Sequence, residues 1–261
     1  MMKVSRKLSI SFSNKWIYSF QMIIFIIFII INVSRVCADD LPLIVLDPGH
    51  GGTDTGAKGY YQSTEKKITL TLARRIALHM KNHYDVLLTR ETDDYVPLIE
   101  RTAIANHAQA IAFISLHVGA SFRLNPQGIR TYYWQSGQGE NYYSDIPNND
   151  TDPNKGTQPL LWDHLQRYHV VSSKMLAKCV HNSILSQISI YDRKIGGCPL
   201  FVLTGADMPA ILIEIAYISR PKSENNLLRI PYLDKIARGI SLGVEQFLRK
   251  NTFDSKTPLH F

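Results

Sequence analysis

The chain has 261 residues, of which 45% are hydrophobic and 20% are charged. This length suits one or at most two domains, and this composition excludes a chain that is disordered throughout. Five of the 29 basic residues, and none of the 22 acidic ones, fall within residues 1–38. The remaining residues therefore carry 24 basic and 22 acidic side chains, a net charge of +2, which gives no support to a nucleic-acid partner.

Residues 1–38 have the layout of a secretory signal peptide. A basic start from Lys3 to Lys15 precedes an almost wholly apolar run at 22–33, and Ala38 closes a short segment suited to cleavage. The apolar run is about 12 residues long, whereas a membrane-spanning helix needs about 20. We expect cleavage near Ala38, export across the inner membrane and a periplasmic location. Retention as a membrane anchor is the alternative.

Two cysteines remain after this segment, Cys179 and Cys198. In an exported protein they could form a disulfide. Two separately buried thiols are the alternative, because sequence spacing does not show that the Cα atoms come within bonding range.

After residue 39, apolar runs of strand length alternate with helical patterns. In the first helical pattern Ile68, Leu72, Ile76 and Met80 recur every four residues, which places them on one face. The elements expected up to residue 134 are strands at 43–46, 85–89, 111–116 and 129–134, and helices from about 64 and at 98–108.

Residues 136–159 are rich in Gly, Asn, Asp and Pro and predict a long surface insertion. Beyond it we expect a helix at 160–185, strands at 201–203 and 210–215, and a closing helix at 232–248. Strands that alternate with helices in this way predict a single layered α/β domain.

Four residues at or near the ends of these elements could carry chemistry. His50 follows the first strand in a glycine-rich loop, and His117 ends another apolar run. Glu65 stands at the start of the first helix, and Glu214 interrupts an otherwise apolar strand. A carboxylate in such a strand is costly unless it is paired, protonated or bound to a metal.

Two imidazoles and a carboxylate make up a known catalytic zinc set, which leaves one position for water. A second carboxylate nearby can act as a general base. The alternatives are structural histidines and an ion-paired glutamate. The residues form no compact HExxH signature, so their spacing alone does not decide between a zinc site and structural roles.

The motif Asp47-Pro48-Gly49-His50-Gly51-Gly52, followed by Glu65, resembles the zinc-dependent N-acetylmuramoyl-L-alanine amidases of the amidase 3 type. The similarity covers about residues 43–248. It continues through the segments at 89–93, 98–101, 105–106, 113–117, 128–133, 173–177, 209–214 and 236–240.

The resemblance implies a roughly six-stranded mixed sheet flanked by helices, with one Zn²⁺ per chain. It implies that His50, Glu65 and His117 are zinc ligands and that Glu214 is the catalytic carboxylate. The reaction would be hydrolysis of the amide between the muramyl lactyl group and L-Ala of peptidoglycan stem peptides. A zinc peptidase acting within the stem peptide, or a non-catalytic peptidoglycan-binding or regulatory protein, are the alternatives.

The domain organisation that follows is a signal peptide at 1–38, a catalytic domain at 39–250 and a tail at 251–261, in a monomeric chain. Arg90 and Arg101 could bind stem-peptide carboxylates through their two-pronged guanidinium groups, with a structural ion pair as the alternative. An insertion at about 136–168 could block the zinc until an activator protein displaces it, or could be an ordinary surface elaboration.

Overall fold

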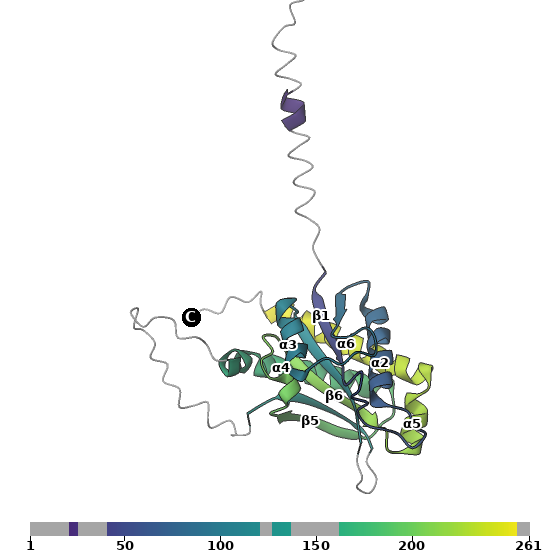
Figure 1. Ribbon diagram of the computed structural model, residues 1–261. Helices are drawn as coiled ribbons and strands as arrows, with labels where there is room; N and C mark the ends of the chain where they lie inside the picture. Colours follow the sequence, from purple (N-terminus) through teal and green to yellow (C-terminus); the bar gives the residue numbers. More distant parts are fainter. Residues whose placement is uncertain (1–20, 26–40, 121–126, 137–161, 255–261) are drawn as a thin grey trace, which may run out of the picture. The chain divides into compact units, whose positions relative to one another are not determined.

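The computed structural model describes residues 21–25, 41–120, 127–136 and 162–254 (Figure 1). The chain divides into two compact units, residues 1–41 and 42–261. Almost all of the expected signal peptide and most of the expected insertion therefore lie outside the described residues. Of the helices that are described, none is both long and apolar enough to cross a membrane.

A mixed sheet of six strands runs through the second unit, with helices on both sides (Figure 1). The strand order is β2-β1-β3-β6-β4-β5. The first four strands in this order are parallel, β4 is antiparallel to β6, and β5 is parallel to β4. The expected six-stranded mixed sheet is confirmed. Its strands are β1 (Leu43–Pro48), β2 (Asp85–Leu88), β3 (Ala112–Gly119), β4 (Ile129–Trp134), β5 (Asp192–Cys198) and β6 (Ala210–Tyr217).

Successive residues of a strand point to opposite faces of the sheet, and each face has its own core. Ile44 and Leu46 of β1 pack in the cluster that holds the apolar sides of α2 (Glu65–Met80), α4 (Trp162–Gln187) and α6 (Ile230–Asp254). Val45 packs on the other face with α3 (Leu98–His107) and η2 (Phe201–Leu203). The short helix α5 (Pro221–Leu227) lies between β6 and α6 in the chain. The four-residue repeat expected on α2 is buried along its whole length.

One expected strand at the far end of the sheet is wrong, and another strand there was not expected. Residues 201–203 are a short 3-10 helix instead of a strand, because Val202 and Leu203 are buried against the α3 face. The edge strand is β5, whose sequence DRKIGGC has one branched apolar residue and two glycines and so lacks a strand pattern. Helix α5 was not expected either.

The disulfide is not formed. Cys179 is buried in the α4 core, Cys198 ends β5, and both are free thiols.

Because β1, β3 and β6 are parallel, their carboxyl ends lie at the same edge of the sheet, where ligands collect in α/β folds. The chain that leaves β1 forms a loop there and then enters α2 at Glu65. This edge holds the candidate site.

Candidate metal centre

The loop after β1 has an unusual backbone. His50 has a φ of 64°, in the left-handed region that histidine enters more readily than most side chains. The N–H of Gly49 donates to the carbonyl of Leu116 at 3.0 Å, and Gly51 and Asp54 bond to each other across the turn. These bonds hold His50 in a conformation that directs its ring towards Glu65.

Two glycines allow the site side chains to pack directly on this loop. A Cβ on Gly49 would lie 2.5 Å from Cε1 of His117. A Cβ on Gly56 would lie 2.6 Å from Oε2 of Glu65 and 2.6 Å from Cδ2 of His50. All three distances are shorter than real Cβ contacts, so no larger residue fits at either position without moving the site.

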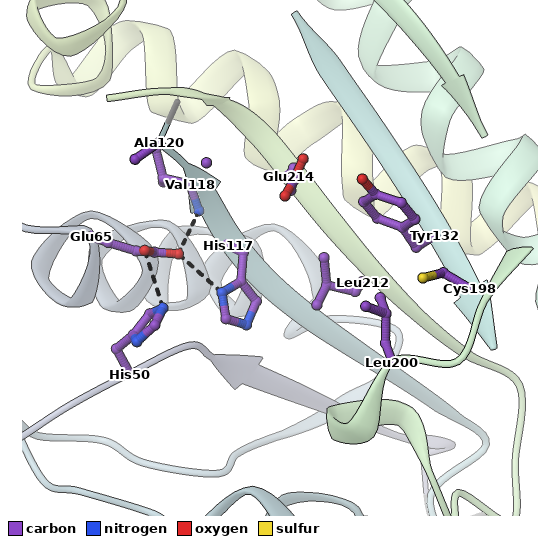
Figure 2. A pocket seen from close by; sticks show the side chains of 11 residues that line it. His50, Glu65, His117, Val118, Ala120, Tyr132, Cys198, Leu200, Leu212 and Glu214 are labelled. Atoms are coloured by element: carbon purple, nitrogen blue, oxygen red, sulfur yellow. Dashed lines mark hydrogen bonds and ion pairs between the residues drawn. The ribbon is translucent and has the colours of Figure 1, made fainter. Parts of the chain in front are cut away.

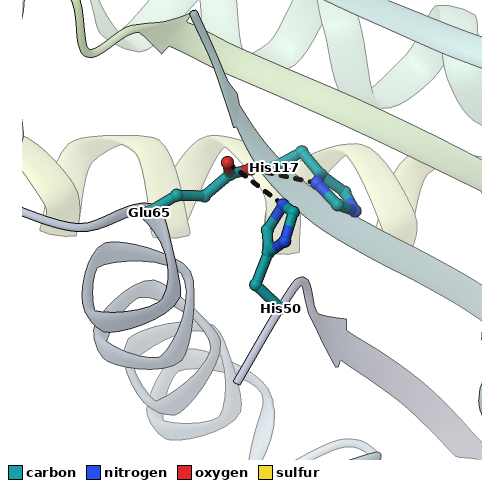
Figure 3. A group of neighbouring side chains, drawn as sticks. All are labelled: His50, Glu65 and His117. Atoms are coloured by element: carbon teal, nitrogen blue, oxygen red, sulfur yellow. Dashed lines mark hydrogen bonds and ion pairs between the residues drawn. The ribbon is translucent and has the colours of Figure 1, made fainter. Parts of the chain in front are cut away.

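His50, Glu65 and His117 meet at this point (Figure 3). Nε2 of His50 lies 3.1 Å from Oε2 of Glu65, and Nδ1 of His117 lies 3.0 Å from Oε1 of Glu65. One ligand atom from each residue can be chosen so that all lie within 4.8 Å of one another. Two imidazole nitrogens and one carboxylate oxygen at this spacing fit a catalytic zinc site.

Glu65 is the centre of the cluster and is only 4% exposed. Its Oε2 accepts the N–H of Ala57 at 2.9 Å, and its Oε1 accepts the N–H of Val118 at 2.8 Å. Burial would raise the pKa of this carboxyl, but hydrogen bonds from His117 and His50 hold the pKa well below its ordinary value. The Glu65 carboxylate is therefore ionised and held in one orientation, so its oxygens can coordinate a metal ion.

Asp54 orients His50 from the outer side. Nδ1 of His50 lies 2.8 Å from Oδ2 of Asp54, and the other oxygen of Asp54 accepts the N–H of Gly56 at 3.0 Å. Burial lowers the pKa of His50, but Glu65 and Asp54 together raise it above 6.5. A carboxylate behind a ligating histidine fixes the ring and its tautomer. Sequence reasoning missed Asp54, although its position four residues after His50 in a glycine-rich turn was a usable signal.

Glu214 shares a cleft with this cluster (Figure 2). It lies on β6 directly across the ladder from His117 on β3. Figure 2 shows the cluster at one end of the cleft, Glu214 in its middle, and Tyr132 and Cys198 at the other end. The hydroxyl of Tyr217 donates to Oε2 of Glu214 at 3.3 Å. The four residues singled out in the sequence are thus brought to one cavity.

Arg101 lies beneath the loop and not in the cleft. It is 2% exposed, and its Nη1 donates to Oδ1 of Asp47 at 2.6 Å. Asp47 is fully buried and also accepts the hydroxyls of Thr89 and Ser115, each at 2.7 Å. Arg101 also reaches the carbonyl of His50 at 3.3 Å. These contacts match the structural alternative for Arg101.

Arg90 is buried as well, at 4% exposure. Its Nε donates to the carbonyl of Pro48 and its Nη2 to the carbonyls of Gly49 and Lys66, all at 2.9 Å. Its guanidinium group is therefore occupied by backbone on both sides of the loop and has no free edge for a substrate carboxylate. Neither arginine lies in the cleft, so the sequence-based suggestion that they bind substrate has no support from their positions.

Comparisons with known proteins agree with this geometry. A family model described as N-acetylmuramoyl-L-alanine amidase matches residues 44–246. The chain is 31% identical over 215 residues to the amidase AmiA of Escherichia coli K12, covering 77% of this chain and 74% of that protein. It is 27% identical over 222 residues to an AmiC of Escherichia coli, covering 80% of this chain but only 53% of that protein.

Two solved structures are similar in fold. The amidase AmiC2 of Nostoc punctiforme has a TM-score of 0.64 at 27% identity, covering 80% of this chain and 97% of that one. An N-acetylmuramoyl-L-alanine amidase of Clostridium difficile has a TM-score of 0.65 at 29% identity, covering 84% of this chain and 100% of that one. The similarity thus extends over the whole α/β unit.

Proposed function

This chain belongs to the N-acetylmuramoyl-L-alanine amidase family, and on that premise we propose that it cleaves peptidoglycan with one bound zinc ion. It hydrolyses the amide between the muramyl lactyl group and L-Ala of the stem peptide, in cell-wall remodelling or daughter-cell separation. The observation that carries the zinc proposal is the convergence of His50, Glu65 and His117 with Glu214 in one cleft.

The donor set favours zinc over other common ions. Imidazole nitrogen suits zinc, whereas magnesium and calcium prefer sites made entirely of oxygen. His50, Glu65 and His117 would hold the ion. When bound, zinc supplies a Lewis acid that polarises the scissile carbonyl and makes water more acidic.

Glu214 would move the proton. Its carboxylate accepts a proton from the attacking water and then gives it to the L-Ala nitrogen as the C–N bond breaks. The products are a lactyl carboxylate and a peptide with a free amine. General acid–base catalysis of this kind contributes roughly 10²–10⁴-fold to the rate.

The location and the domain boundaries complete the proposal. The basic start and short apolar run of residues 1–38 support export, and residues 39–250 would be the periplasmic catalytic domain with a tail at 251–261. The insertion at about 136–168 follows β4, whose Tyr132 lines the cleft. An activator protein that acts on the insertion of a monomeric enzyme is part of the proposal.

The test is product analysis on purified sacculi, with and without a chelator. An amidase releases intact stem peptides with a free L-Ala amine, and the chelator stops the release. A peptidase would release shortened peptides, and a binding module would release none. Metal analysis should give about one zinc per chain, and either of those other product patterns contradicts the proposal.

A further inference from the structure

Positive charge lies beside the cleft, next to the lining residues Glu214 and Tyr132. Arg130 on β4 lies opposite Glu214 in the antiparallel ladder, and Glu214 lies opposite His117 in the parallel one. His117, Glu214 and Arg130 therefore form a row across three neighbouring strands. Adjacent strands are roughly 4.8 Å apart, so Arg130 starts roughly 10 Å from His117.

Arg130 is held over an aromatic ring of the cleft. Its Cζ lies 4.9 Å from the centroid of Tyr132, which lines the cleft. Its Nε is buried and has no hydrogen-bond partner within the described part of the chain. Gly196 on β5 leaves room for this guanidinium group, since a Cβ there would lie 3.3 Å from Nη2. Stacking fixes the guanidinium plane, and no residue in the described part of the chain forms a hydrogen bond with its two Nη groups.

Arg193 on β5 is linked to Glu214 through Tyr217. Its Nη1 donates to the hydroxyl of Tyr217, and that hydroxyl donates to Glu214. The Cζ of Arg193 lies 4.9 Å from the centroid of the Tyr217 ring. Burial and the charge of Glu214 raise the pKa of both Tyr132 and Tyr217, while Arg193 acts on both in the opposite direction. The four side chains thus form one cluster around Glu214.

The cluster has an excess of positive charge. Over the described residues, no carboxylate lies within ion-pair distance of Arg130 or Arg193. Glu214 is the acidic residue of this cluster, paired with Arg130 in the ladder and linked to Arg193 through Tyr217. Two guanidinium groups against one carboxylate leave a site for one further anion, and guanidinium groups bind carboxylates best.

We infer, resting on the proposed amidase function, that Arg130 and Arg193 bind a free carboxylate of the acidic stem peptide. Only the peptide side of the scissile bond offers such a group, on the residue after L-Ala. That carboxylate lies about two residue lengths, roughly 7 Å, from the scissile carbonyl. An arginine side chain that starts roughly 10 Å from His117 can reach it. The peptide therefore leaves the metal centre across β6 and β4, and the glycan lies on the opposite side.

The test uses two synthetic substrates that differ in one group. One is N-acetylmuramoyl-L-alanyl-γ-D-glutamyl-L-lysinamide, in which the D-glutamate α-carboxylate is free, and the other is the same molecule with that carboxylate converted to its amide. We expect the zinc-loaded wild-type enzyme to prefer the carboxylate by about tenfold or more in kcat/KM. Arg130→Gln and Arg193→Gln should each bring this ratio towards one, mainly through KM.

Arg229→Gln is the matched control, because Arg229 is exposed on the surface and removing it changes the net charge equally. It should keep the wild-type ratio. A wild-type ratio near one overturns the inference without any variant, and so does a ratio that is unchanged in both Arg130→Gln and Arg193→Gln. Peptide release from sacculi by the same preparations tests the amidase function separately, so the two failures are distinguishable.

Discussion

His117 on β3 and Glu214 on β6 are paired residues in the same parallel ladder. The proposed metal ligand and the proposed proton carrier are therefore spaced by sheet register and not by loop conformation. Both strands are buried through their centres, and a slip by one residue would turn every side chain to the other face. The core packing that fixes the register thus also fixes the distance between metal chemistry and proton transfer.

Glu214→Gln should separate these two functions. The amide keeps the shape of the side chain but cannot accept a proton, so we expect kcat to fall by about 10²-fold or more. Zinc content should stay near one per chain, because Glu214 is not in the ligand cluster. Metal analysis and turnover on sacculi measure the two effects, and near-normal turnover would remove Glu214 from the role.

Asp54→Ala should weaken zinc binding without unfolding the protein. The side chain of Asp54 is 46% exposed and orients His50, and loss of such an outer partner costs about 10–100-fold in metal affinity. Competition with a chelator measures the zinc affinity. Asp85→Ala is the control, because Asp85 is exposed on the edge strand β2. Equal zinc affinity in the two variants would contradict the role of Asp54.

Gly56→Ala should disrupt the ligand cluster by steric contact. Gly56 has a φ of 59°, so an alanine there also suffers backbone strain of about 1–2 kcal/mol. Gly205→Ala isolates that strain, since Gly205 has a φ of 80° and an added Cβ has no atom within 4 Å. We expect both variants to melt at lower temperature but only Gly56→Ala to lose zinc. Zinc loss in both would show that strain alone is responsible.

Glu224 should make the stability of the folded protein depend on pH in the acidic range. It is fully buried on α5 and accepts the backbone N–H groups of Tyr61 and Ser63, at 2.9 and 3.2 Å. Burial would raise its pKa, but these bonds and the Ser63 hydroxyl lower it below the ordinary 4.5. A lowered pKa in the folded state means that the stabilisation is complete above the unfolded value and is lost as the pH falls through the folded one.

Glu224→Gln should therefore melt several degrees lower than the wild type at pH 7, for a loss of about 1–3 kcal/mol. The difference in melting temperature between the two proteins should become smaller once the pH falls below about 4, where the wild-type carboxyl also becomes protonated. Melting curves in excess chelator remove the contribution of the metal. If the difference in melting temperature stayed the same from pH 7 to pH 3, the Glu224 carboxylate would not be its cause.

The sequence predicted the parts of the site that repeat a local pattern. His50 sits in a turn that only glycines and a few polar residues can form, and Glu214 is the one charge in a buried strand. Asp54 escaped notice because an exposed aspartate in a turn is ordinary until the partner of its oxygen is known. Arg130 escaped because its place opposite Glu214 depends on an antiparallel pairing between distant segments.

The elements of the fold also divide into those with a local sequence pattern, which were predicted, and those that depend on distant segments, which were not. The strands with continuous apolar runs were predicted within a few residues, because burial on both faces demands such runs. Strand β5 lies at the edge of the sheet, where it pairs with β4, and an edge strand does not need a continuous apolar run. Its single branched apolar residue, Ile195, was therefore too weak a signal to predict a strand. Phe201 to Leu203 looked like a strand because of its apolar residues, although two of the three cover α3 instead.

The buried Asp47 has a consequence for the life of the enzyme. Its bonds to Arg101, Thr89 and Ser115 tie the end of β1 to α3, to the residue after β2 and to β3, and none of these bonds involves a side chain of the proposed metal ligands. A molecule stripped of its ion would keep the socket in shape. If the site holds the proposed zinc ion, the protein could lose and regain it with no need to fold again.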